Sequence, residues 1–293
     1  MSVPLVRGYK AGPQAPPLVM VTAYDAPGAR IADGAGVDMI LVGDSLAMVV
    51  LGYENTLQVT ISDMAHHTAA VARVRPRALV VADMPWMSYH TTPADTLANA
   101  ACLIRAGAVA VKLEGGRRRL DMVAALVGAE IPVMGHLGLT PQSVNTMGGY
   151  RVQARQVEAI EELMADAAAL EAAGVFAIVL EGVPDVVAAT VTSSLGIPTI
   201  GIGAGRGCDG QVLVFHDVLG LEERIVAKFV RRYADLAGTA TEALASFAAD
   251  VRAGRFPTDA ESYHLADDVA LALYSAGVAP AARLSDPPKG RTA

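Results

Sequence analysis

The chain has 293 residues, of which 53% are hydrophobic and 18% are charged, a composition typical of a globular protein with a large core. Its formal net charge is −7 and its only basic run is Arg117-Arg118-Arg119, which argues against a nucleic-acid partner. No apolar run approaches the roughly 18 residues of a membrane-spanning helix, and residues 1–12 lack the apolar segment of a secretory signal. We therefore expect a soluble, cytoplasmic protein with no membrane partner.

Strand-like and helix-like segments alternate along most of the chain. Residues 1–17 carry Pro13, Pro16 and Pro17 and are predicted to form an irregular lead-in. Short runs of small and branched apolar residues predict strands over residues 18–23, 37–42, 78–82, 109–114, 131–135, 175–180, 197–202 and 211–215. Helices are predicted over residues 26–35, 62–74, 94–106, 117–128, 156–173, 184–194 and 222–236.

Eight strands separated by helices predict a (β/α)₈ TIM barrel of the α/β class, which typically has about 250 residues. We expect a single domain over residues 18–278, in which extra C-terminal helices follow the barrel, and a disordered tail over residues 279–293. One link fits the barrel poorly, because residues 203–210 are too few for a crossover helix between the last two strands. A doubly wound open sheet is therefore the alternative fold.

The fourth predicted strand carries two charges inside an apolar run. Lys112 and Glu114 are two positions apart, so their side chains point to the same side of the strand. The surrounding sequence indicates burial on both faces of the sheet, where charged groups are costly unless they are paired or used. The pair is either a structural salt bridge or part of a binding site.

Ionisable residues stand at the carboxyl ends of five consecutive predicted strands. In a barrel these ends share one face, on which active sites are built. An isolated aspartate at such a position is more often a helix cap, but six ionisable groups would repel or desolvate one another without a common ligand. The pattern predicts a cation bound together with a polar substrate. The six residues are Asp44, Asp83, Lys112, Glu114, His136 and Glu181.

The residue types narrow the choice of cation. Carboxylates without a cysteine cluster favour a hard ion bound through oxygen, and Mg²⁺ fits because it accepts few protein ligands. Zinc is disfavoured, because His66 and His67 are adjacent on a predicted helix and their side chains diverge. Residues 201–205 are glycine-rich but do not complete a dinucleotide-binding fingerprint, and no P-loop is present.

Nine short stretches, spread in order over residues 18–236, together resemble the ketopantoate hydroxymethyltransferase family. Each stretch alone would be a weak signal, whereas the set is specific. The stretches are Thr22-Ala23-Tyr24-Asp25, Val42-Gly43-Asp44-Ser45-Leu46, Leu51-Gly52-Tyr53, Ala82-Asp83-Met84-Pro85, Val111-Lys112-Leu113-Glu114-Gly115-Gly116, Gly135-His136-Leu137-Gly138-Leu139-Thr140-Pro141-Gln142, Leu180-Glu181, Gly201-Ile202-Gly203-Ala204-Gly205 and Cys208-Asp209-Gly210-Gln211.

The resemblance implies a (β/α)₈ barrel enzyme of pantothenate synthesis, commonly a homodecamer. Its implied reaction transfers a hydroxymethyl group from 5,10-methylenetetrahydrofolate to the α-keto acid 3-methyl-2-oxobutanoate, with Mg²⁺ stabilising the enolate. The implied roles place Asp44, Asp83 and Glu114 around Mg²⁺, place Asp44, Ser45, Asp83, Lys112 and His136 at the keto acid, and make Glu181 the proton-transfer residue.

The sequence departs from the family pattern at four positions, none of which has an implied metal or proton-transfer role. They bear on loop packing, folate affinity or C-terminal contacts. Ala47 and Ala154 stand where glycine is expected, and Asn145 and Glu261 stand where histidine is expected.

Two other functions stay open on the sequence. One is a related barrel enzyme that makes or breaks a C–C bond beside a Mg²⁺-bound keto acid, as in isocitrate lyase and phosphoenolpyruvate mutase. Those relatives usually carry a Lys-Lys-Cys-Gly-His loop, which this chain lacks. The other is a non-catalytic keto-acid sensor, which has no need for Glu181 beside Lys112 and Glu114.

Overall fold

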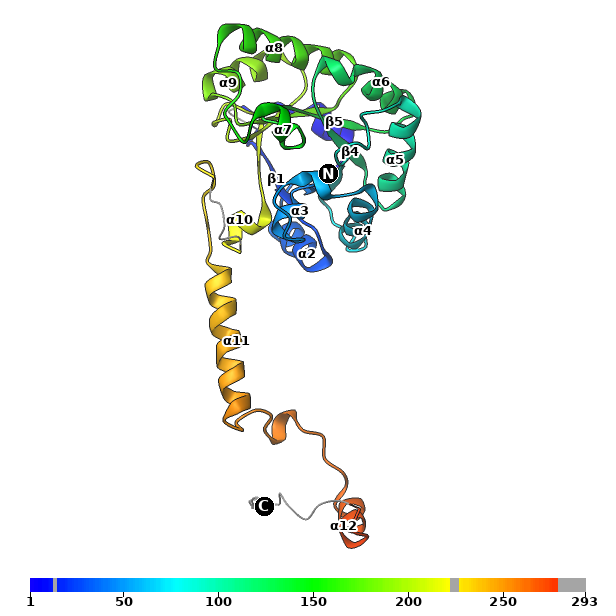
Figure 1. Cartoon of the computed structure of the whole chain (residues 1–293), viewed down its shortest axis with the longest axis vertical. Helices are drawn as coiled ribbons and strands as arrows, with labels where there is room; N and C mark the ends of the chain where they lie inside the picture. The colour runs from blue at the N-terminus through cyan, green and yellow to red at the C-terminus, as the bar shows by residue number, and fades with distance from the viewer. Residues whose placement is uncertain (13–14, 222–226, 279–293) are drawn as a thin grey trace. The chain divides into compact units, whose positions relative to one another are not determined.

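The computed structural model describes residues 1–12, 15–221 and 227–278, and it divides the chain into two compact units, residues 1–237 and 238–293. The first unit contains a closed barrel of eight parallel strands in sequence order (Figure 1). The strands are β1 (Leu18–Thr22), β2 (Met39–Val42), β3 (Leu79–Asp83), β4 (Ala110–Glu114), β5 (Val133–Gly138), β6 (Ala177–Glu181), β7 (Thr199–Ile202) and β8 (Gly210–Leu213).

Closure of the sheet confirms the predicted barrel and shows that the open-sheet alternative is wrong. Strand β1 pairs in parallel with both β2 and β8, so the described sheet has no free edge. The short link from β7 to β8 contains no helix, and it turns through Gly203 and Gly205, whose φ angles are 61° and 75°. A Cβ at Gly205 would lie 2.4 Å from the Cβ of Asp185, so the link needs glycine there.

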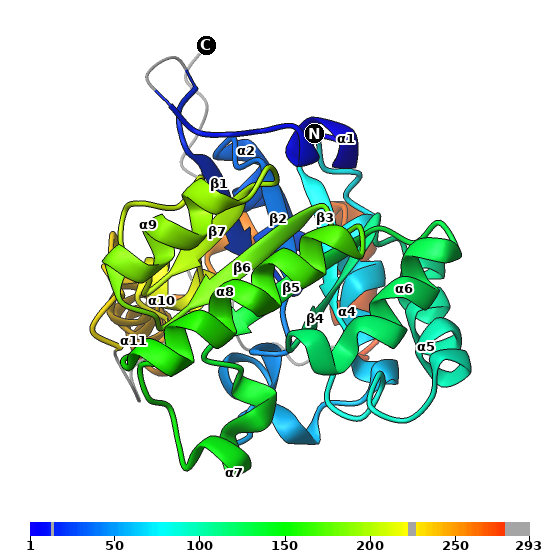
Figure 2. The same cartoon turned by 90° about the horizontal axis from the view of Figure 1, so that it is seen from above.

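Helices surround the barrel, and Figures 1 and 2 show α2, α4, α5, α6, α8 and α9 around the outside of the strands. Shorter helices lie in the connections and at the amino end of the chain. The helices of the first unit are α1 (Val3–Arg7), α2 (Ala26–Gly34), α3 (Leu46–Val49), η1 (Thr56–Gln58), α4 (Ile61–Ala72), α5 (Pro93–Arg105), η2 (Arg117–Arg119), α6 (Leu120–Gly128), η3 (Pro141–Ser143), α7 (Val144–Met147), α8 (Val157–Ala172), α9 (Asp185–Ser194) and α10 (Phe215–Leu219).

Two local predictions were wrong. The lead-in predicted to be irregular contains α1, whose Val6 is fully buried beneath the barrel strands. The helix predicted over residues 222–236 is absent from residues 227–235, and residues 222–226 lie outside the described part. The backbone there makes a single turn, in which Val230 N donates to Ala227 O at 2.9 Å, and it also bonds to α10, because Tyr233 N donates to Val218 O at 2.8 Å. The predicted disordered tail, residues 279–293, also lies outside the described residues.

The alternation of side chains along each strand separates two apolar layers. On β2, Ile40 and Val42 face the surrounding helices, whereas Met39 and Leu41 belong to the cluster that fills the barrel. The same period of two places Leu79 and Val81 of β3 inside the barrel. Continuing that period to the carboxyl ends of the strands brings polar residues into the interior. Those residues are Asp83, Lys112, Glu114, His136 and Glu181.

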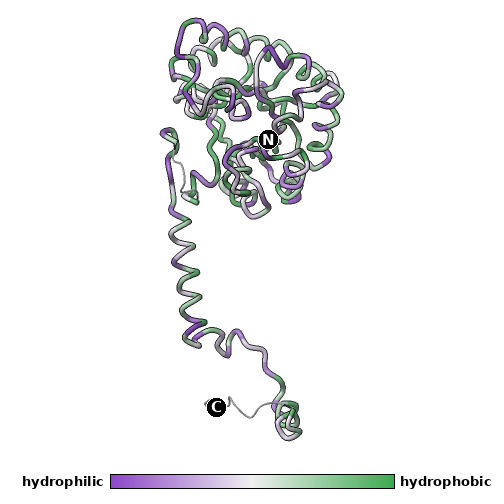
Figure 3. Tube along the Cα trace, in the orientation of Figure 1, coloured by the Kyte–Doolittle hydropathy of each residue, from purple (hydrophilic) through white to green (hydrophobic). Residues whose placement is uncertain are grey.

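The second unit contains the extra C-terminal helices that the sequence predicts: α11 (Leu236–Arg252), η4 (Asp259–Glu261) and α12 (Asp267–Ser275). Figure 3 shows apolar and polar segments interleaved along α11. Its Leu244, Phe247 and Val251 follow helical spacing and are exposed. No helix in the described part of either unit is both long and apolar enough to cross a membrane.

Candidate active site

Strand pairing brings the predicted site residues side by side at the carboxyl end of the barrel. Asp83 of β3 is in register with Lys112 of β4, and Glu114 of β4 is in register with His136 of β5. Glu181 ends β6, opposite Gly138 of β5. The first four side chains are almost fully buried, and Glu181 is 15% exposed. Glu181 is therefore the most accessible ionisable group of this set.

Lys112 links two strands. Its Nζ lies 2.8 Å from Asp83 Oδ1 and 3.2 Å from His136 Nδ1. Asp83 Oδ2 accepts a hydrogen bond of 3.0 Å from the backbone N–H of Asp44, which follows β2 by two residues. Burial lowers the pKa of Lys112, but the carboxylates of Asp83, Glu114 and Asp44 raise it above its ordinary value. Lys112 is thus a permanent cation in the site.

His136 lies between two glutamates. Its Nδ1 is 3.4 Å from Glu114 Oε1, and its Nε2 is 3.3 Å from Glu181 Oε2. Burial and the nearby Lys112 ammonium lower the pKa of His136, whereas the two glutamates raise it, and the net result is a pKa of about 9. The raised pKa favours the protonated imidazole near neutral pH.

The site holds more carboxylates than cations. Burial, followed by repulsion from Asp83 and Glu114, raises the pKa of Asp44 well above its ordinary value. Burial also raises the pKa of Asp83, although Lys112 opposes this. Glu114 Oε1 and His136 Nε2 are buried without a hydrogen bond, and Asp83 Oδ1 has only its ion pair with Lys112. Such unfulfilled capacity indicates a site that a ligand completes.

Ser45 lies at the edge of this cluster, directly after Asp44. It is half-buried, and its Oγ is 2.8 Å from the hydroxyl of Tyr24, which follows β1. A Cβ at Gly43 would come within 2.8 Å of Ser45 Oγ, so the absence of a side chain at Gly43 leaves room for this hydroxyl.

Two site residues were not predicted from the sequence. Tyr89 and Gln142 are buried among the carboxylates, and each bonds to the region of Glu114. Gln142 also donates to Asp44 Oδ2 at 2.8 Å. Both residues are neutral and lie in connections, so no excess of charge at a strand end marks them. The only sequence signal was the position of Gln142 within the stretch that follows β5.

The carboxylates predicted to bind Mg²⁺ come together, but they are not arranged as ligands. Within the part of the chain that the structure describes, no group of three or more His, Cys, Asp or Glu residues is positioned to hold a metal ion. Gln142, Lys112 and His136 contact Asp44, Asp83 and Glu114 respectively. The donor atoms are nevertheless of the hard oxygen type that Mg²⁺ prefers.

The four departures from the family pattern are not among the residues that form this cluster. Ala154 has a φ of 50°, in the left-handed region, which explains why glycine is expected there. Ala47 is fully buried in α3, and Asn145 is exposed in α7. Glu261 is exposed and caps η4 through Thr258. Ala47 contacts the cluster through its backbone, because its N–H donates to Asp44 O at 2.9 Å.

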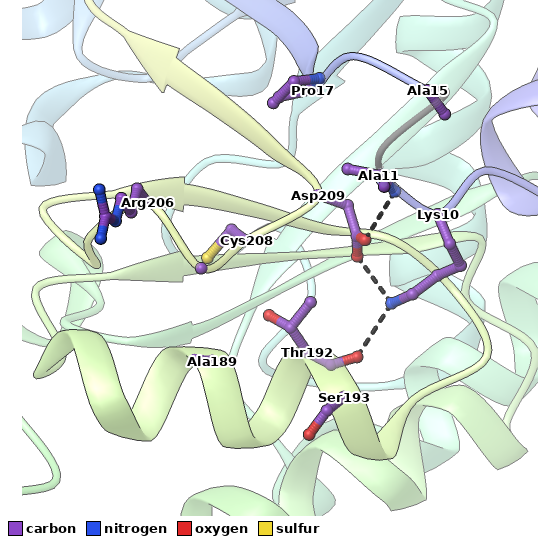
Figure 4. A pocket seen from close by; sticks show the side chains of 12 residues that line it. Lys10, Ala11, Ala15, Pro17, Ala189, Thr192, Ser193, Arg206, Cys208 and Asp209 are labelled. Atoms are coloured by element: carbon purple, nitrogen blue, oxygen red, sulfur yellow. Dashed lines mark hydrogen bonds and ion pairs between the residues drawn. The ribbon is translucent and has the colours of Figure 1, made fainter.

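A cavity of about 420 Å³ lies elsewhere in the first unit (Figure 4). Lys10, Thr192 and Asp209 line it, and Lys10 Nζ contacts Asp209 Oδ2 at 2.7 Å and Thr192 O at 2.9 Å. The Thr199 and Ala11 backbone N–H groups donate to the same Asp209 carboxylate. Since Lys10 and Asp209 already satisfy one another, this cavity offers no unpaired buried charge.

Comparisons with known proteins point to one family. A profile described as ketopantoate hydroxymethyltransferase matches residues 7–259. The 3-methyl-2-oxobutanoate hydroxymethyltransferase of Pyrobaculum calidifontis is 58% identical over 241 residues, covering 82% of this chain and 91% of that protein. The protein of the same name from Koribacter versatilis is 55% identical over 258 residues, covering 88% of each chain.

Solved structures with the same fold are much less similar in sequence. Phosphoenolpyruvate phosphomutase from Streptomyces platensis subsp. rosaceus has a TM-score of 0.56 at 15% identity, over 95% of this chain and 96% of that one. A 2,3-dimethylmalate lyase of the phosphoenolpyruvate mutase/isocitrate lyase superfamily has a TM-score of 0.51 at 18% identity, over 90% and 91%. At these identities the likeness establishes the barrel fold alone.

Proposed function

The chain belongs to the ketopantoate hydroxymethyltransferase family and adds a hydroxymethyl group to 3-methyl-2-oxobutanoate to form 2-dehydropantoate, and we propose that the strand-end cluster performs this reaction. The observation that carries the proposal is the meeting of four carboxylates with Lys112 and His136 in the buried carboxyl end of the barrel. The substrate brings a negative carboxylate and an acidic C3–H group, which call for a cation and a base.

Lys112 and Ser45 supply the contacts for the substrate carboxylate in this proposal. Lys112 remains protonated, and its ammonium is preorganised by Asp83 at 2.8 Å. A fixed cation in a water-poor site orients an anionic substrate at little reorganisation cost. Ser45, half-buried beside Asp44, offers a hydroxyl to the same end of the substrate. The ketone then points toward the carboxylates of the neighbouring strands.

Mg²⁺ fits the oxygen donors of Asp44, Asp83 and Glu114, which would hold it directly or through water. The raised pKa of Asp44, caused by burial and by the adjacent carboxylates, reflects a shortage of positive charge that a divalent cation relieves. When bound, the ion would act as a Lewis acid toward the ketone oxygen and would make the C3 proton easier to remove.

Glu181 is proposed as the general base that removes the C3 proton. It is the most accessible carboxylate of the cluster and stands on the strand next to β5. His136, 3.3 Å from Glu181, orients its carboxylate and can share the proton after transfer. The carbanion at C3, delocalised as an enolate, then attacks the one-carbon unit of the donor. The two bonds from that carbon to the folate nitrogens break, water supplies the hydroxyl group, and the nitrogens take up the remaining proton of water and the proton held by Glu181.

The donor is proposed to be 5,10-methylenetetrahydrofolate, as the family resemblance implies. A homodecamer and a cytoplasmic location are proposed on the same basis. Water supplies the hydroxyl group as the one-carbon unit is released from folate.

A transfer assay with purified full-length protein tests these assignments. We expect 2-dehydropantoate to form only when 3-methyl-2-oxobutanoate, 5,10-methylenetetrahydrofolate and Mg²⁺ are all present. Unchanged turnover after removal of divalent ions with a chelator would contradict the metal assignment. Product formed at the same rate without the folate would contradict the proposed donor.

A further inference from the structure

A continuous chain of hydrogen bonds joins two residues of the cluster, Glu114 and Asp44. It runs from the backbone N–H of Glu114 through Tyr89 and Gln142 to Asp44. We propose that Gln142 and Tyr89 form a positioning pair that sets the carboxylates of Asp44 and Glu114 for a divalent cation. This inference rests on the proposed function, since it concerns the same cation.

The chemistry of the groups fixes the direction of every bond in this chain. A backbone N–H can only donate, so Glu114 N donates to the Tyr89 oxygen at 3.2 Å. The single Tyr89 proton is then given to Gln142 Oε1 at 2.6 Å. That orients the Gln142 amide so that Nε2 donates to Asp44 Oδ2 at 2.8 Å and to Met84 O at 3.0 Å. The opposite amide orientation would set Oε1 against two acceptors.

Gln142 holds both carboxylates at once. While its side chain binds Asp44 Oδ2, its backbone N–H donates to Glu114 Oε2 at 3.0 Å. Of the second oxygens, Glu114 Oε1 is buried without a hydrogen bond and lies 3.4 Å from His136 Nδ1, and Asp44 Oδ1 is not the oxygen that Gln142 binds. Each carboxylate is thereby held through one oxygen, and its other oxygen is left for a ligand. Residues that support a metal-binding carboxylate hold it in this way.

Tyr89 is rigidly seated, which suits it to a positioning role. Its side chain is completely buried, and the guanidinium carbon of Arg119 lies 5.7 Å from its ring centroid. Gln142 is 5% exposed, so neither group exchanges partners freely with water. A pair fixed in this way holds the carboxylates in place relative to the barrel strands and does not itself contact the substrate.

Calorimetric titration of the full chain with Mg²⁺ tests the pair. Gln142→Leu removes every side-chain hydrogen bond at similar volume, and we expect it to weaken Mg²⁺ binding roughly 10–100-fold, as is usual for partners of metal ligands. Tyr89→Phe keeps the ring and removes only the hydroxyl, and a smaller loss of roughly 3–10-fold is expected. In turnover assays the Mg²⁺ concentration for half-maximal rate should rise, while kcat at saturating Mg²⁺ should fall much less.

The control is Asn99→Leu, which removes an amide that donates to Ser88 O in the nearby connection but does not reach the carboxylates. It should leave Mg²⁺ affinity unchanged, whatever it does to the melting temperature. If Gln142→Leu does not fold, the isosteric Tyr89→Phe decides the question. Folded variants that bind Mg²⁺ as tightly as the wild type would overturn the positioning role. A wild-type chain that binds no Mg²⁺ would instead overturn the metal assignment itself.

Discussion

Two lysine–aspartate pairs in the same barrel differ in how completely they are satisfied. In the Lys10–Asp209 pair, the ammonium contacts Asp209 and two backbone carbonyls, and the carboxylate also accepts from two backbone N–H groups. In the Lys112–Asp83 pair, both side chains are buried, and further carboxylates crowd around them. The first pair is closed and neutral, whereas the second belongs to a cluster with excess negative charge.

The difference teaches how a buried ion pair reveals its role. A pair whose hydrogen-bonding capacity is filled fastens one segment to another, and here Lys10 ties the lead-in to the start of β8. A pair set among surplus carboxylates is costly in the free protein and gains its partners when a ligand binds. Matched substitutions of a glutamate and of a lysine in the two regions test this distinction, and the pH dependence of stability tests the strand-end cluster by itself.

The largest effect is expected from changing the proposed base. Glu181→Gln keeps the size of the side chain but removes its capacity to take a proton, so turnover should fall roughly 10²–10⁴-fold. The matched change is Glu171→Gln, because Glu171 only accepts backbone N–H bonds from Gly196 and Ile197. Steady-state assays should show near-normal turnover for that variant. Equal losses in the two variants would remove the distinction between the regions.

Substitution of the two lysines should affect different quantities. Lys112→Met removes the cation for the substrate carboxylate and should raise KM for the keto acid roughly 10–100-fold, as for a lost charged hydrogen bond. Lys10→Met leaves Asp209 buried without its ion-pair partner and should lower the free energy of unfolding by up to about 3 kcal/mol. Thermal melts and substrate titrations of both variants provide the readout. An unchanged KM in Lys112→Met would identify its pair as structural.

A smaller effect concerns pH and stability in the absence of metal. The pKa of His136 in the folded protein is about 9, above its ordinary value of 6.5, because Glu114 and Glu181 outweigh burial and Lys112. The contribution of His136 to the free energy of unfolding is therefore fully present below pH 6.5 and is lost as the pH rises through about 9. This contribution amounts to up to about 3 kcal/mol. Denaturant unfolding of wild type and His136→Gln should show their difference shrinking over that window. A difference that grows with pH would reverse the assigned sign.

The sequence predicted those features that local patterns determine. Short runs of small and branched apolar residues located the strands, and charges at five strand ends located the cluster, since parallel strands in a barrel bring these ends together. Closure of the barrel, despite the short link over residues 203–209, was harder to predict than the strands. It depends on pairing between β1 and β8, which are distant in sequence. Gln142 and Tyr89 were missed because neutral residues in connections carry no local signal of burial.

The central claim is that the strand-end cluster, and not the other buried pair, activates the substrate. It is tested most directly by exchange of the C3 hydrogen of 3-methyl-2-oxobutanoate into deuterated water, with Mg²⁺ present and folate omitted. Wild-type protein and folded Asp209→Asn should exchange this hydrogen at similar rates, whereas Asp83→Asn should be slower by roughly 10²-fold or more. Exchange at the wild-type rate in Asp83→Asn, or its loss in folded Asp209→Asn, would contradict the account.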